Sequence, residues 1–398
     1  MGQKISIIQN GNDVIYDFIK HTQGRMKFVP YDEFKDVEFI TEGGFSRIYK
    51  ATWINGPEMT VALKELAGSK NITSEHLNEL KISNDFVSSC EYPSHLNFND
   101  YNKIITFHGI TQCPITQNFL IITKYYKSGS LAQYIAKNFF NMNWDSKLYI
   151  LNDIIFGLKT IHDADIIHKD YHSGNIFIDI DDDLLSAITG DLGLSKSSLD
   201  DEKDDKVYGN IPYVAPEIFQ GKMYTKASDI YSIGMIMWEL MAGRKPFWNR
   251  DHDVELIIDI FDGLRPPIIA DAPNGYVDLM KKCWHSNPNE RPTAAELQKN
   301  IEYILVNEPC CKTKIMKSLD IEPITIHSSC SKNSTISSMT TRSSESEINT
   351  VIHYDDADYI TKEIEFDIEI SQYDDMNQYI VLTIICIYNI FTVFSLCI

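Results

Sequence analysis

Two short polar motifs near the middle of the chain constrain its fold more than any other feature. The first is His168-Lys-Asp-Tyr-His-Ser-Gly-Asn175, and the second is Gly190-Asp191-Leu-Gly193. Between them, two apolar stretches flank an acidic turn, and this pattern predicts a β-hairpin over residues 176–189. Because a hairpin returns the chain to its starting point, Asn175 and Asp191 are expected to lie close together in space.

The residue types in these motifs suit phosphoryl transfer, which asks a protein mainly for positioning and for stabilisation of charge. Asp170 has the carboxylate needed to orient an attacking hydroxyl and to accept its proton. Asn175 and Asp191 supply oxygen atoms, which are the ligands that Mg²⁺ prefers. Each of these residues alone is more often a turn residue, so the hypothesis depends on their joint order.

Two features upstream fit the same chemistry. The segment Ile40-Thr-Glu-Gly-Gly-Phe-Ser-Arg-Ile48 lies between two strand candidates, and glycine there lets backbone N–H groups approach a phosphate. Two adjacent glycines alone are more often an ordinary turn. The segment Val61-Ala-Leu-Lys64 then reads as an apolar strand ending in lysine. Such a lysine usually points into solvent, but its position soon after the glycine turn predicts that Lys64 reaches bound phosphates.

Taken in this order, the motifs resemble those of the eukaryotic protein kinase family over residues 36–305. The resemblance implies an α+β fold with two lobes. A small antiparallel sheet with one helix, helix C, is expected over about 36–123, and a larger, mainly helical lobe over about 127–305. The resemblance also implies ATP and Mg²⁺ as cofactors and a protein as substrate.

The family pattern assigns roles to individual residues of this chain. Its catalytic residues correspond to Asp170, Lys64 and Glu79, and its metal ligands to Asn175 and Asp191. Its ATP-binding positions correspond to Thr41, Glu42, Gly43, Gly44, Phe45, Ser46, Ile48, Ala62, Lys64, Thr123, Lys124 and Tyr126. Its structural positions correspond to His168, Glu217, Asp229 and Arg291. The roles of Thr123, Lys124 and Tyr126, at the hinge between the lobes, rest on the family alone.

The chain departs from the family pattern at several positions. Thr41 and Ser46 stand where two glycines are usual, Lys169 replaces an arginine, and Leu192 replaces a phenylalanine. None of these changes removes a catalytic group, so an active enzyme is expected. The alternative is a pseudokinase, a scaffold that keeps the fold without turnover.

Sequence features of the large lobe favour serine and threonine over tyrosine as the phosphate acceptor. Tyr213-Val-Ala-Pro-Glu217 is closer to the serine/threonine form, since tyrosine kinases usually carry a tryptophan there. The stretches 228–234 and 283–292 resemble the tyrosine-kinase-like group, which mostly modifies serine and threonine. A tyrosine or dual-specificity kinase is the alternative, and the choice rests on family resemblance.

Composition limits the partners and the compartment. The 398 residues carry a formal net charge of −20, which argues against a general nucleic-acid surface. The eight cysteines form no C-x-x-C pair, and there is no secretory signal, so a cytoplasmic location is expected. Residues 1–35 are expected to form an N-terminal arm. Residues 306–375, rich in serine and threonine and then acidic, are expected to be a disordered linker.

Both ends of the chain suggest membrane attachment. Met1-Gly-Gln-Lys-Ile-Ser6 fits the N-myristoylation pattern, with a coincidental N-terminus as the alternative. Residues 379–398 carry no charged side chain and are long enough to cross a bilayer core about 30 Å thick. Asn389 within this segment, and Asp374 and Asp375 before it, argue against a transmembrane helix. A packed apolar tail and a stretch absent from the mature protein are the other interpretations.

Overall fold

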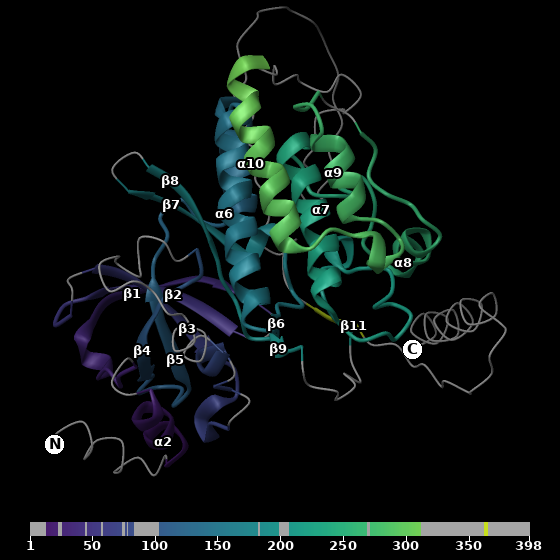
Figure 1. The fold of residues 1–398 in the computed structure, drawn as a ribbon. Coiled ribbons are helices and arrows are strands. Elements are labelled where there is room, and N and C mark those ends of the chain that lie inside the picture. The colour runs from purple at the N-terminus through teal and green to yellow at the C-terminus, as the bar shows by residue number, and fades with distance from the viewer. Residues whose placement is uncertain are drawn as a thin grey trace, which may run out of the picture.

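The chain folds into a small β-sheet lobe and a larger helical lobe, as Figure 1 shows. This α+β, two-lobed arrangement is the one that the sequence predicts. The computed structural model describes residues 13–22, 26–43, 46–56, 59–73, 76–77, 79–82, 103–181, 184–198, 207–268, 271–311 and 362–364.

The small lobe is built on a five-stranded sheet with the strand order β1-β2-β3-β5-β4. Each neighbouring pair in this sheet is antiparallel, as predicted. The strands are β1 (Phe34–Glu42), β2 (Ser46–Trp53), β3 (Met59–Leu66), β4 (Phe107–Gln112) and β5 (Phe119–Lys124).

Successive side chains along β3 point alternately to the two faces of the sheet. Val61 and Leu63 are completely buried on one face. Lys64 points to the opposite face because successive side chains alternate. Its direct cross-strand neighbours are Ile48 on β2 and Ile121 on β5. The sheet thus places the predicted positions Ile48, Ala62, Lys64 and Thr123 on one face, whereas the side chain of Lys124, paired with Val61, lies on the other.

An apolar cluster on the Lys64 face of the sheet, which also contains Ile121, includes residues from before the sheet. Helix α2 (Asp13–His21) contributes Ile15, which is 1% exposed and packs in one cluster with Leu77, Leu80 and Phe119. Phe28 joins the same cluster and forms a parallel bridge with Ile110 on β4. Part of the expected N-terminal arm therefore packs against the small lobe (Figure 1).

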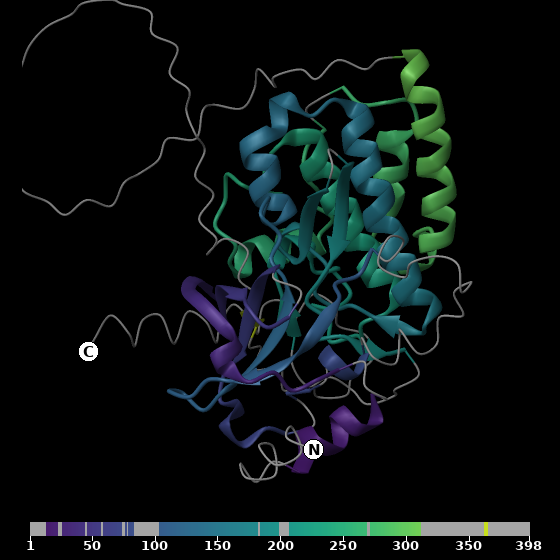
Figure 2. The same cartoon turned by 90° about the vertical axis from the view of Figure 1, so that its left-hand side faces the viewer.

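The large lobe packs helices around α7, and Figure 2 shows the layer of α6 and α10 beside it. Almost all of α7 is buried, and Thr225 caps its N-terminus through a hydrogen-bonded capping box with Ser228. Apart from a few polar residues such as Asp229, Ser232 and Glu239, the helix is apolar nearly all round, the pattern of a helix at the centre of a lobe. The helices are α5 (Leu131–Asn138), α6 (Trp144–Asp163), α7 (Lys226–Ala242), α8 (Val254–Phe261), α9 (Tyr276–Cys283) and α10 (Ala294–Cys311).

Short strands connect the helices of the large lobe to the site. The predicted hairpin is confirmed as β7 (Ile176–Asp181) paired with β8 (Leu184–Thr189). Strand β6 (Ile166–Ile167) pairs with β9 (Lys196–Ser197). Strand β10 (Val207–Gly209) pairs with β11 (Lys362–Ile364), which comes from far along the sequence.

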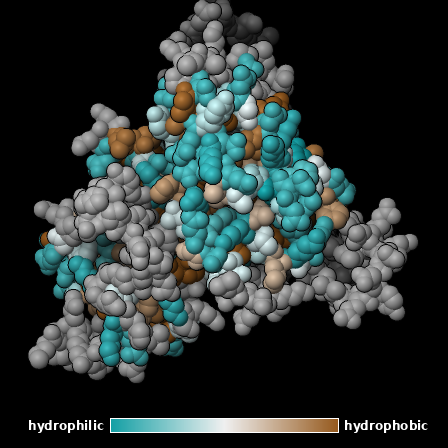
Figure 3. All heavy atoms as spheres, viewed as in Figure 1, coloured by the Kyte–Doolittle hydropathy of each residue, from teal (hydrophilic) through white to brown (hydrophobic). Residues whose placement is uncertain are grey.

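The surface of the helical lobe that faces the viewer in Figure 3 is mostly hydrophilic. Among the described residues, no helix combines the length and the apolar character that crossing a membrane requires. The two candidate membrane-attachment segments, residues 1–6 and 379–398, lie outside the described residues.

Candidate active site

Lys64 joins three elements of the fold at the face of the sheet. Its Nζ lies 2.9 Å from Oε2 of Glu79 and 2.7 Å from Oδ1 of Asp191. Lys64 comes from β3, Glu79 from the helical residues 79–82, and Asp191 follows β8 in the large lobe. The structure therefore brings these three predicted residues into one cluster.

The charges of this cluster shift one another's pKa. Burial disfavours the charged form of Lys64, but the two carboxylates outweigh it and raise the pKa of the lysine. Burial would also raise the pKa of Asp191, yet attraction by Lys64 and its hydrogen bond lower it below the ordinary value. Burial, reinforced by the charge of Asp191, raises the pKa of Glu79 against the attraction of Lys64. Lys64 and Asp191 are thus held charged.

The second cluster lies in the loop between β6 and β7. Nδ2 of Asn175 donates to the carbonyl oxygen of Asp170 and to its Oδ2, both at 3.0 Å. His172 Nε2 lies 3.5 Å from Oδ1 of the same carboxylate. Because the amide nitrogen of Asn175 faces Asp170, its oxygen is the atom that can serve as a metal ligand.

Asp229 on α7 supports this loop from the core of the large lobe. Its carboxylate accepts hydrogen bonds from the backbone N–H of His168 at 2.9 Å and of Lys169 at 3.0 Å. His162 Nε2 lies 2.9 Å from Oδ2 of Asp229. Lys169 has a φ of +72°, a conformation that a side chain disfavours, so these bonds hold a strained loop in place.

His168 connects the two motifs that the sequence singles out. It is completely buried, and its Nε2 lies 3.0 Å from the carbonyl oxygen of Gly190, the residue before Asp191. At the open end of the hairpin, the N–H of Gly190 donates to the carbonyl oxygen of Asn175 at 2.8 Å. The hairpin thus brings its two ends together as predicted.

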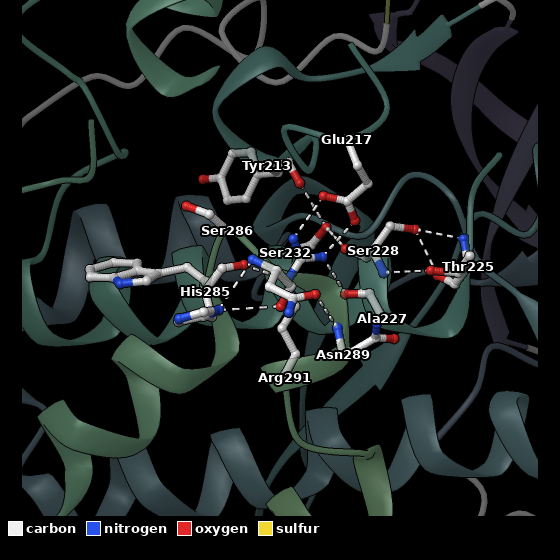
Figure 4. Close-up of polar contacts among 12 residues, drawn as sticks. Tyr213, Glu217, Thr225, Ala227, Ser228, Ser232, His285, Ser286, Asn289 and Arg291 are labelled. Carbon is white, nitrogen blue, oxygen red and sulfur yellow. Dashed lines mark hydrogen bonds and ion pairs between the residues drawn. The ribbon is translucent and has the colours of Figure 1, made fainter. Parts of the chain in front are cut away.

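A buried ion pair fixes the segment that precedes α7. Arg291 Nη1 and Nη2 donate to the two carboxylate oxygens of Glu217 at 2.6 and 2.7 Å, a bidentate arrangement. Figure 4 shows the guanidinium directed at Glu217 and at the carbonyl oxygen of Ala227, 2.9 Å away. Arg291 Nε also donates to the carbonyl oxygen of His285 at 2.8 Å. The four predicted structural residues therefore all make buried polar contacts.

The predicted nucleotide positions occupy the sheet and the connection between the lobes. Thr123 pairs directly with Ala62, so both lie on the face of Lys64. Lys124 Nζ binds Asp179 Oδ2 on β7 at 2.7 Å. In the glycine turn, the N–H of Gly43 donates to the carbonyl oxygen of Ser46 at 2.8 Å.

The remaining positions of the glycine turn lie at or beside its two strands. Thr41 pairs with Ile48, and Glu42 forms an exposed ion pair with Arg47 at 2.9 Å. Gly44 and Phe45, also predicted to bind ATP, lie outside the described residues.

Phe177 and Gly209 lie at this site and were not among the residues predicted from the sequence. The rings of Tyr126 and Phe177 stack with centroids 5.4 Å apart and an interplanar angle of 13°. Gly209 lies beside the loop, because a Cβ added there would stand 3.7 Å from Asp170 Oδ1. Its φ of +136° favours glycine. The sequence position of Phe177, two residues after Asn175, could have indicated that it lies near the site. The approach of Gly209 to Asp170 depends on the path of the chain in space.

Comparison with known proteins identifies the class to which this fold and site belong. The sequence model for the family described as "Protein tyrosine and serine/threonine kinase" matches residues 34–301. The chain therefore belongs to this family of eukaryotic-type protein kinases.

Individual relatives bear similar descriptions. A putative serine/threonine-protein kinase/receptor of Acanthamoeba polyphaga mimivirus is 26% identical over 278 residues, covering 69% of this chain and 16% of the relative. A probable serine/threonine-protein kinase of Dictyostelium discoideum is 29% identical over 280 residues, covering 70% of this chain and 16% of the relative. The chain thus matches only a small part of the length of either relative.

Proposed function

We propose that this chain is an ATP- and Mg²⁺-dependent kinase that phosphorylates serine and threonine hydroxyls of protein substrates. The observation that carries the proposal is the position of Lys64 between Glu79 and Asp191, at 2.9 and 2.7 Å. A cation held between the two lobes can bind a polyphosphate and orient it toward the loop of Asp170.

The donor set fits a nucleotide with a magnesium ion. Asn175 and Asp191 offer hard oxygen ligands, and a bound ion would offset negative charge on the phosphates. The side chain of Asp191 is 39% exposed, so it is accessible to a ligand although it pairs with Lys64. A Cβ at Gly193 would stand 3.2 Å from Asp191 Oδ1, so glycine keeps space beside this carboxylate.

Different residues of the chain are proposed to bind the phosphates, to accept the proton and to position the acceptor. Lys64 holds the phosphate oxygens, and Asp170 orients the substrate hydroxyl and accepts its proton. The hydroxyl oxygen forms a bond to the γ-phosphorus, the bond from that phosphorus to the bridging oxygen breaks, and ADP leaves. Asn175 keeps the acceptor carboxylate in place through its bond to Oδ2 of Asp170.

The adenine is proposed to bind where the lobes meet. Ala62 and Thr123 form the wall contributed by the sheet, with backbone groups of Lys124 and Tyr126 at the adenine edge. The carbonyl oxygen of Tyr126 accepts from the N–H of Gly129 at 3.0 Å, so the N–H of Tyr126 is the group expected to bind adenine.

Serine and threonine specificity is supported by the names of the relatives and by the sequence Tyr213-Val-Ala-Pro-Glu217. A tyrosine or dual-specificity kinase, and a pseudokinase scaffold, are the competing proposals. The intact set Lys64, Glu79, Asp170, Asn175 and Asp191 favours catalysis over the scaffold.

The domain boundaries and the location of the chain are part of the proposal. Residues 36–305 are proposed as the kinase domain, a range supported by the family match over 34–301. Helix α10 continues past this boundary to Cys311. Residues 306–375 are proposed as a linker, but it is not disordered throughout as the sequence predicts, because 306–311 belong to α10 and 362–364 form β11. A cytoplasmic location, with attachment through residues 1–6 or 379–398, stays a prediction.

The test is transfer of labelled phosphate from ATP to a generic protein mixture, followed by phosphoamino acid analysis. Asp191→Asn is the inactive variant. Asp163→Asn is the matched control, because Asp163 is 61% exposed in a surface pair with Lys159. Phosphoserine and phosphothreonine made by the wild type and the control, but not by Asp191→Asn, support the proposal. Phosphotyrosine alone contradicts the specificity, and equal labelling by Asp191→Asn contradicts the site.

A further inference from the structure

A segment from the far C-terminal part of the chain pairs with the large lobe beside the candidate active site. Strand β11 (Lys362–Ile364) lies antiparallel to β10 (Val207–Gly209), and Figure 1 draws it as a short yellow strand at the foot of the large lobe. The register pairs Val207 with Ile364, Tyr208 with Glu363, and Gly209 with Lys362.

Strand β10 ends next to the proposed proton acceptor. A Cβ on Gly209 would stand 3.7 Å from Asp170 Oδ1. The hydroxyl of a substrate must come within hydrogen-bonding reach of the same carboxylate for its proton to be removed. A chain paired with β10 therefore occupies the immediate neighbourhood in which a substrate must bind.

The end of β10 is firmly held, so it presents a preformed edge. Tyr213, shortly after β10, donates its hydroxyl to Glu239 Oε2 at 2.8 Å, and its carbonyl oxygen accepts from Ser232 Oγ at 2.7 Å. Glu239 and Ser232 both belong to the buried helix α7. Within the described residues, β10 and β11 form a sheet of two strands, so β10 has an open edge whenever β11 is absent.

We propose that β10 is a docking edge for extended peptide segments, and that residues 362–364 occupy it in cis and compete with the protein substrate. Adding a strand to an open edge is a common way to bind an extended peptide, because main-chain hydrogen bonds supply the affinity. The pairing covers three residues, so it is weak and reversible, and the covalent tether raises its effective concentration. The competition with substrate rests on the proposed kinase function, whereas the pairing itself does not.

The first experiment measures hydrogen exchange on the full-length protein, and it requires no catalysis. The variant K362P/E363P/I364P removes every N–H donor of β11. The matched control D367P/I368P/E369P places the same number of prolines later in the same acidic tail. Because ladder hydrogen bonds alternate along an antiparallel strand, the amides of β10 that face β11 are expected to exchange at least about fivefold faster in the β11 variant than in the wild type and the control.

The pairing is refuted if the β11 variant exchanges at the wild-type rate. Protection that grows with protein concentration would assign the pairing to two copies of the chain and would refute the cis arrangement. A thermal unfolding midpoint equal to that of the wild type verifies that the β11 variant is folded.

The second experiment measures steady-state phosphorylation of a protein substrate by the same three proteins. Loss of β11 is expected to lower the KM for the protein substrate at least about fivefold, with the KM for ATP unchanged. An unchanged protein KM, together with changed exchange, refutes the competition. Failure of all three proteins to transfer phosphate, with the exchange result intact, counts against the proposed function and leaves the pairing standing.

Discussion

Replacing Arg291 with methionine is expected to destabilise the large lobe strongly. The Arg291 side chain is 0% exposed and that of Glu217 is 6% exposed, with 2.6 Å between Nη1 and Oε1. Removing one member of a buried pair leaves the other charge without compensation, which costs about 3–5 kcal/mol. For a unit of this size, each kcal/mol lowers the midpoint by about 2–4 °C, so Arg291→Met should lower Tm by about 10 °C.

A surface arginine provides the matched control. Arg250 forms an ion pair with Asp259 at the same 2.6 Å, but the two side chains are 32% and 46% exposed. Arg250→Met is expected to cost less than about 1 kcal/mol, because exposed pairs contribute little. Urea denaturation of both variants measures the difference in the free energy of unfolding.

If Arg291→Met costs no more than Arg250→Met, burial does not make the Arg291–Glu217 pair important for stability. A second check adds Glu217→Gln to Arg291→Met, which removes the uncompensated carboxylate. The double variant is expected to be less destabilised than the sum of the two single variants, by at least about 1 kcal/mol. Strict additivity would show that the two side chains do not act as a pair.

Three further predictions concern burial, backbone conformation and support of the loop. Burial lowers the pKa of Lys147 to about 7, so its destabilising effect is full below that pH and fades toward the ordinary lysine pKa of about 10.4. In thermal or urea unfolding, Lys147→Met should therefore stabilise by about 3 kcal/mol more near pH 6.5 than near pH 9.5, and a pH-independent effect would contradict this. Gly209→Ala should lower the free energy of unfolding by about 1–3 kcal/mol, because φ is +136° and the added Cβ would meet Val214 Cγ2 at 2.8 Å. Gly221 also has a positive φ, +72°, but a Cβ there would have nothing within 4 Å, so Gly221→Ala measures the cost of backbone conformation without a steric clash. Asp229→Asn removes charge-assisted bonds to the loop and should lower kcat at least about tenfold with little change in the KM for ATP, whereas a wild-type kcat would contradict its supporting role.

Local patterns predicted the parts of the site that depend on neighbouring residues. The hairpin 176–189 has the expected ends because apolar stretches and an acidic turn define both strands. Lys64 points toward the site because strand periodicity places it opposite the buried Val61 and Leu63. The 3-4-3 spacing of Leu148, Leu151, Ile155 and Leu158 predicts a helix with one buried face, and all four side chains are completely buried on α6.

Contacts between distant parts of the chain were beyond the reach of sequence patterns. The stacking of Tyr126 on Phe177 depends on how the hinge approaches β7. The burial of Ile15 against Leu77 and Phe119 requires α2 to fold back on the small lobe, although residues 1–35 show no strong periodicity. The pairing of β10 with β11 joins two segments, 207–209 and 362–364, that are far apart in the sequence. In each case the partner is selected by the three-dimensional path, which no local propensity specifies.

The role of Asp170 can be measured as the single-turnover rate of phosphate transfer from ATP to a protein substrate by the wild type and by Asp170→Asn. If Asp170 is the proton acceptor, the variant should react about 10²- to 10⁴-fold more slowly and bind ATP with unchanged affinity. Asp163→Asn should react at the wild-type rate, because Asp163 is an exposed residue of a surface pair. A rate for Asp170→Asn within a few-fold of the wild type would contradict the assignment of Asp170 as the proton acceptor, and with it the proposed mechanism of phosphoryl transfer.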